Sequence, residues 1–68
     1  MRKLNDFEKG ILTACAIIQA THDDPTVAAD VIRESGLQDA DCSDLDDFDK
    51  EYLKIIQEQE RLNLTGLD

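Results

Sequence analysis

The chain has 68 residues, of which 16 are acidic and 7 are basic, so its formal net charge is −9 at pH 7. This length predicts a single domain, covering residues 1–68, whose small core leaves little stability to spare. The charge leads us to exclude direct binding to nucleic acid and to anionic membranes, because both would repel so acidic a chain.

The sequence predicts a cytoplasmic protein. Polar residues interrupt the longest apolar run, from Ile11 to Ala20, so no stretch is suited to crossing a bilayer. The segment before this run is basic at only two positions and then turns acidic, which argues against a signal peptide. Cys15 and Cys42 match no zinc or redox spacing, which favours idle thiols in a reducing compartment.

The first predicted helix extends from about residue 5 to a turn at Thr21–Asp24. Asn5 and Glu8 have the spacing of a capping box, in which each side chain bonds the backbone N–H of the other residue. Apolar side chains then recur at steps of three and four, which predicts one buried helix face. The residues expected on this face are Leu4, Phe7, Ile11, Ala14, Cys15, Ile18 and His22.

The second predicted helix is short and has a signal at each end. Asp24 can cap its first free N–H groups, and Pro25 suits the first helical position. Gly36 can adopt the left-handed conformation that closes a helix, after which Leu37 would fold back onto Ile32 in a Schellman motif. The residues expected to face a neighbouring helix are Val27, Ala28, Val31 and Ile32.

The third predicted helix starts near Ser43, where Asp46 stands three residues later in a second capping pattern. It extends for about 20 residues, or about 30 Å, and ends near Asn63 or Gly66, which can close a helix. Its apolar positions exceed what one core stripe needs. We therefore expect an exposed dimer face made of Leu53, Ile56, Leu62 and Leu64.

Together these segments predict an all-α fold, a compact three-helix domain with a short central helix and a longer C-terminal helix. The last two helices resemble the layout of a helix-turn-helix, in which the third helix would enter the major groove. A recognition helix needs Arg, Lys, Asn or Gln there, and this one would present mainly carboxylates. We therefore expect no contact with DNA.

Two groups of residues are candidates for a catalytic or metal-binding site. His22 stands beside Asp23 and Asp24, but the chain has no second histidine and no nucleophile at a defined spacing. The two aspartates are better explained as negative charges at a helix start. An alignment of the downstream acidic stretch with a calcium-binding loop places Asp44 where the loop needs Gly and Lys50 where it needs Glu. We therefore expect no catalytic, cofactor or metal site.

An acidic run precedes and enters the third helix. Its members are Asp39, Asp41, Asp44, Asp46, Asp47, Asp49 and Glu51. One interpretation is that these carboxylates only complement the helix dipole, by about 0.3–1 kcal/mol each, and form a solvated face. The other is a binding face for a basic partner, including mimicry of nucleic-acid phosphates.

We therefore expect a small, acidic, non-enzymatic protein-binding module, an inhibitor or adaptor whose partner is a basic, nucleic-acid-binding protein. Small acidic helical proteins of this kind are common among phage and mobile-element inhibitors, a resemblance of type that no motif carries. The alternative is a homodimeric structural or regulatory module that associates through the C-terminal helix.

Overall fold

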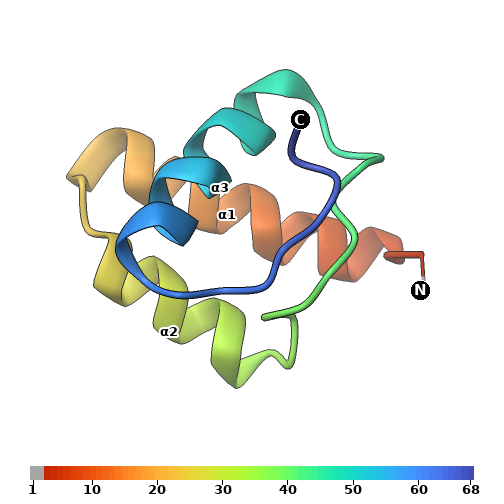
Figure 1. Ribbon diagram of the computed structural model, residues 1–68, viewed down its shortest axis with the longest axis horizontal. Coiled ribbons are helices and arrows are strands. Elements are labelled where there is room, and N and C mark those ends of the chain that lie inside the picture. The colour runs from red at the N-terminus through yellow and green to blue at the C-terminus, as the bar shows by residue number, and fades with distance from the viewer. Residues whose placement is uncertain (1–2) are drawn as a thin grey trace.

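Three α-helices account for the regular secondary structure of residues 3–68, the part of the chain that the computed structural model describes (Figure 1). They are α1 (Asp6–His22), α2 (Pro25–Glu34) and α3 (Asp47–Gln59), and each packs against the other two. The predicted all-α three-helix domain is confirmed, although α1 rather than α3 is the longest helix, with 17 residues against 13. No helix in this range combines the length and the apolar composition that a membrane crossing requires.

α1 begins as predicted, but the face that it buries agrees only in part with the predicted one. Leu4 and Cys15 are buried as expected, and Ile11 and Ile18 are half-buried against the core. Asn5 and Glu8 form the capping box, in which the Asn5 side chain accepts from the Glu8 N–H at 2.8 Å and the Glu8 side chain accepts from the Asn5 N–H at 3.0 Å. Phe7, which we expected in the core, is 77% exposed, and Ala14 and His22 are exposed as well. The face that α1 buries is thus rotated by about one residue step, ~100°, from the predicted one. Its buried residues are Leu12, Cys15, Ala16 and Gln19.

α2 has both of its predicted ends. The Asp24 carboxylate accepts a hydrogen bond from the backbone at the start of the helix, at 3.2 Å. At the other end Gly36 has a φ of 72°, and the Leu37 N–H donates to the Ile32 carbonyl at 2.9 Å, as the Schellman motif requires. The buried residues of α2 are Ala28, Ala29 and Ile32. The expectation that its two valines are buried is wrong, because Val27 is 47% exposed and Val31 is 36% exposed.

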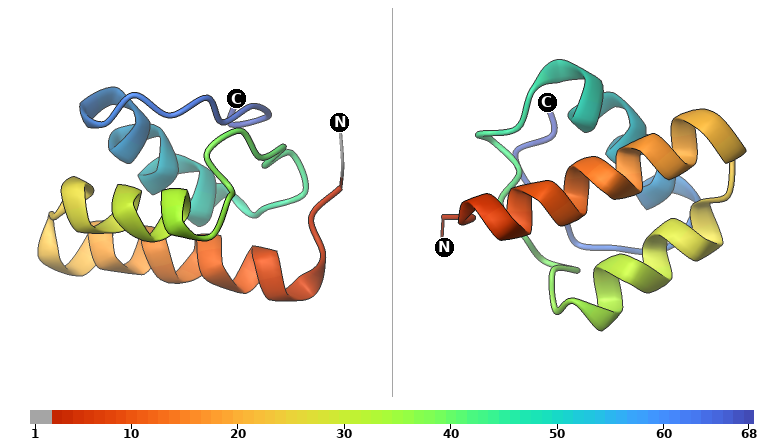
Figure 2. Two further views of the ribbon diagram at one scale, coloured as in Figure 1. Left: turned by 90° about the horizontal axis from the view of Figure 1, so that it is seen from below. Right: turned by 180° about the vertical axis from the view of Figure 1, so that it is seen from behind.

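α3 ends at Gln59, several residues before its predicted end, and the chain then turns back. Residues 60–68 cross the molecule as an extended segment on the side away from α1 (Figures 1 and 2). Gln57 holds this return, because its amide accepts from the Leu64 N–H at 2.6 Å and donates to the Leu64 carbonyl at 3.3 Å. The C-terminal residues thus cover the helices instead of extending α3.

The returning segment pairs with the loop between α2 and α3. The Thr65 N–H donates to the Ala40 carbonyl at 3.0 Å, and the Cys42 N–H donates to the Thr65 carbonyl at 2.8 Å. Gly66 has a φ of 72° but closes no helix, contrary to the prediction. A Cβ at Gly66 would lie 2.6 Å from the Ser43 backbone nitrogen, so only glycine fits this close approach.

The core joins all three helices to the C-terminal segment. It contains the four residues that we expected to form a dimer face. Leu53 and Ile56 are 0% exposed, and Leu62 and Leu64 are 7% and 6% exposed. The expectation of an exposed dimer face at these positions is therefore wrong, since the return of the chain buries them within one molecule.

Candidate protein-binding surface

The seven carboxylates of the acidic run do not share one surface, because some of them hold the fold together. Asp49 is only 4% exposed, and its Oδ2 accepts a hydrogen bond from the Thr13 hydroxyl at 2.7 Å. Asp46, rather than Ser43, is the N-cap of α3, and its Oδ1 accepts from the Asp49 N–H at 2.9 Å. Asp49 is thus unavailable to a partner, contrary to the prediction.

Asp41 also serves the fold. Its Oδ1 accepts a hydrogen bond from the Ser43 N–H at 3.1 Å. Hydrogen bonds from the backbone and side chain of Ser43 lower the pKa of the Asp41 carboxyl below its ordinary value, because they favour the charged form. Gly66 lies close to the same carboxylate. The members of the run that remain exposed are Asp39, Asp44, Asp46, Asp47 and Glu51.

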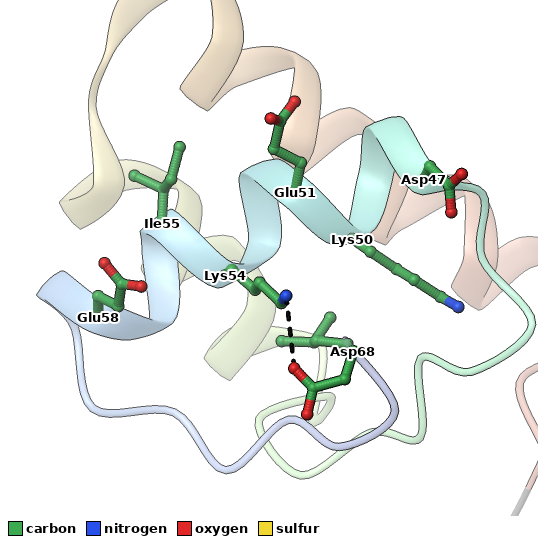
Figure 3. Close-up of a pocket in the computed structure, with 8 residues that line it drawn as sticks. Asp47, Lys50, Glu51, Lys54, Ile55, Glu58 and Asp68 are labelled. Carbon is green, nitrogen blue, oxygen red and sulfur yellow. Dashed lines mark ion pairs between the residues drawn. The ribbon is translucent and has the colours of Figure 1, made fainter.

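Two of these exposed residues, Asp47 and Glu51, border a cleft of about 530 Å³ between α3 and the C-terminal residues (Figure 3). We call it the α3 cleft. Lys54 reaches across it to Asp68, with 3.4 Å between the Lys54 Nζ and the Asp68 Oδ1. The α3 residues of its lining recur at steps of one, three and four, so they share one side of the helix. The complete lining is Asp47, Lys50, Glu51, Lys54, Ile55, Glu58, Leu67 and Asp68.

The α3 cleft contains more negative than positive side chains. Its four carboxylates outnumber its two lysines, Lys50 and Lys54, and Lys54 is already paired. Among residues 3–68, no basic side chain forms an ion pair with Asp47, Glu51 or Glu58. The cleft therefore presents an excess of uncompensated negative charge around a small apolar area.

Only part of this cleft was predictable from the sequence. Glu58 and Ile55 stand seven and four positions after Glu51, and this helical spacing was sufficient to place them on the same side of α3. Leu67 and Asp68 had no such signal, because the predicted helix continued where the chain in fact turns back. The cleft depends on that return, so its second wall was not predictable from local pattern.

The other candidate residues form no reactive arrangement. His22 is the exposed last residue of α1, and Asp23 and Asp24 cap the helices on either side of the turn. Cys15 and Cys42 are free and buried, and burial raises the pKa of each thiol to about 11. Both thiols are therefore protonated and unreactive at neutral pH. In the described part of the chain, no group of three His, Cys, Asp or Glu side chains is placed to hold a metal ion.

The chain matches no protein-family model, no curated protein and no solved structure.

Proposed function

We propose that this protein is a non-enzymatic protein-binding module, an inhibitor or adaptor that engages a basic, nucleic-acid-binding partner through the α3 cleft. The observation that carries the proposal is the excess of unpaired carboxylates in that cleft. Lys and Arg side chains of a partner would neutralise Asp47, Glu51 and Glu58, while an apolar side chain would cover Ile55 and Leu67. A row of carboxylates is attracted to the same surfaces as nucleic-acid phosphates, which is why the partner is a nucleic-acid-binding protein.

The favourable charge at a helix start accounts for only one of these three carboxylates, Asp47. The dipole of a helix favours negative charge within the first turn and opposes it within the last turn. Asp47 lies in the first turn of α3, whereas Glu51 lies beyond it. Glu58 is one residue from the end of the helix at Gln59, where a carboxylate is unfavourable. Negative charge at positions that do not stabilise the helix supports a role in binding.

The proposed place of action is the cytoplasm. Cys15 and Cys42 are both free thiols, as is usual in a reducing compartment. Nucleic-acid-binding partners are also found there.

Titration of the isotope-labelled protein with a basic amphipathic peptide, followed by NMR, tests the proposal. We expect amide shifts to change at residues 47–58 and 67–68, and binding to weaken as salt is added, because partly exposed charges are screened. The peptide stands for the partner segment, with Arg and Lys on one face and Leu on the other.

A pair of variants separates the cleft from the net charge. Glu51→Gln with Glu58→Gln removes two cleft carboxylates, and Asp6→Asn with Glu34→Gln removes the same charge from exposed positions of α1 and α2. We expect the first variant to lose about threefold to thirtyfold in affinity, as two exposed ion pairs would give, and the control less than about twofold. Equal losses, or shift changes spread over all three helices, would mean attraction by overall charge alone and would overturn the proposal.

A further inference from the structure

One face of α1 is apolar and has no partner within the described structure. We call it the outer face of α1, and its exposed residues are Phe7, Gly10, Ala14 and Ile17. Ile11 and Ile18 flank this face and are half-buried against the core. Phe7 is 77% exposed and Ile17 is 47% exposed. In the right-hand view of Figure 2, α1 lies in front of the other helices and no segment passes over it. An apolar helix face of this extent is a candidate interface.

Except for Phe7, which stands between Asp6 and Glu8, the outer face lies in an uncharged stretch of α1. No Asp, Glu, Lys or Arg lies between Lys9 and His22, although the whole chain has a net charge of −9. Two copies of so acidic a chain repel each other wherever their carboxylates meet, so an uncharged face is where they approach at least cost. A basic partner gains nothing from such a face. Charge therefore favours a second copy of the chain as the occupant.

We propose that the outer faces of two copies bind each other, with the α1 helices antiparallel and a twofold axis at Ala14. Gly10 lies four residues before the axis, and Ile17 lies three residues after it. Ile17 of one copy then stands opposite Gly10 of the other, within about one helical rise of 1.5 Å. On the other side of the seam, the exposed parts of Ile11 and Ile18 meet at the same offset, while the rest of each side chain packs against the core of its own molecule.

Gly10 is what makes this packing self-complementary. Glycine weakens a helix interior relative to alanine, and nothing lies within 4 Å of a Cβ built at Gly10, so packing inside the molecule does not require a glycine there. The open space accepts the Ile17 side chain of the second copy, and Ala14 on the axis lets the two helices approach. Large side chains opposite small ones give an interdigitated interface.

Sedimentation velocity over a dilution series up to about 1 mM tests the proposal, with an expected dimer dissociation constant of roughly 10–100 µM for an interface this small. Ala14→Lys places two like charges at the axis and is expected to weaken the dimer by at least about tenfold. Ala20→Lys is the matched control, because Ala20 is an exposed alanine on another side of α1. This control is expected to dimerise like the wild type.

Gly10→Ala distinguishes the interface from the stability of the helix. In dilute, monomeric solution it is expected to raise the thermal midpoint, while it weakens the dimer by about fivefold or more, because a methyl group occupies the space for Ile17. A wild type that stays monomeric at the highest concentration would overturn the proposal. So would an Ala14→Lys dimer as tight as that of Ala20→Lys, or a Gly10→Ala dimer tighter than the wild type.

Discussion

At the scale of single residues, the three glycines differ in what a side chain would meet. Gly66 and Gly36 both have a φ of 72°, a conformation that glycine adopts without strain. A Cβ would meet nothing within 4 Å at Gly36 or at Gly10, but at Gly66 it would lie 2.6 Å from the Ser43 nitrogen and 2.8 Å from the Asp41 carboxylate. The three glycines thus allow the cost of a left-handed backbone conformation to be measured apart from the cost of a steric clash with a new Cβ.

The same substitution at the three positions is therefore expected to give three results. Gly66→Ala should cost about 2–4 kcal/mol, from the left-handed conformation together with the clash against the backbone. Gly36→Ala should cost about 1 kcal/mol, because only the conformation opposes it. Gly10→Ala should stabilise by about 0.5–1 kcal/mol, as expected inside an exposed helix. Urea unfolding of dilute samples measures all three, and equal losses at Gly36 and Gly66 would contradict the close approach of Gly66 to Ser43.

At the scale of the helix, neighbouring carboxylates at the start of α3 have different structural roles. The Asp46 side chain caps the helix, the Asp49 side chain is buried against the Thr13 hydroxyl, and the Asp47 side chain lines the α3 cleft. A sequence in which four of six residues from Asp44 to Asp49 are aspartate gives no sign of this division. The division follows from the packing of α3 on α1, which places Asp49 against Thr13 and leaves Asp47 exposed.

Single substitutions of these carboxylates should change the free energy of unfolding by different amounts, according to their roles. Asp46→Ala is expected to cost about 1 kcal/mol, the usual loss for an N-cap. Asp49→Ala is expected to cost about 1–3 kcal/mol, because the Thr13 hydroxyl loses its acceptor in a half-buried place. Asp47→Asn is expected to change stability by less than about 0.5 kcal/mol. Thermal melts would decide, and a loss at Asp47 as large as at Asp49 would mean that the cleft carboxylates are structural.

Helix α1 shows how far periodicity predicts a buried face. Its limits were predictable because capping and turn residues act locally, as the Asn5–Glu8 box confirms. Its orientation was not, because α1 carries one apolar set around Leu12 and another around Ala14, and both recur at helical spacing. Only the packing of α2 and α3 decides which set is buried. The predicted set is therefore divided. Leu4 and Cys15 are buried and Ile11 and Ile18 pack against the core, whereas Phe7 and Ala14 lie on the outer face and His22 is exposed.

At the scale of the whole molecule, the return of residues 60–68 explains most of what the sequence did not predict. Leu62 and Leu64 alternate with exposed residues, which is the period of an extended segment and not of a helix. Two such residues are too few to outweigh the helical pattern of α3, so the period was misassigned there. The length of α3, the burial of the expected dimer face and the second wall of the α3 cleft all follow from this one turn of the chain.

Adjacent substitutions in the returning segment test its extended conformation. Leu64→Ala is expected to destabilise the protein by about 2–4 kcal/mol, because it empties part of the core. Asn63→Ala should have an effect below about 0.5 kcal/mol, since this side chain is exposed and the Asn63 N–H still donates to the Gln38 carbonyl. Both losses are measured by urea unfolding below the concentration at which dimers form. If Leu64→Ala were as stable as Asn63→Ala, Leu64 would have to lie on the surface. That result would favour the longer third helix with an exposed leucine face that the sequence predicts.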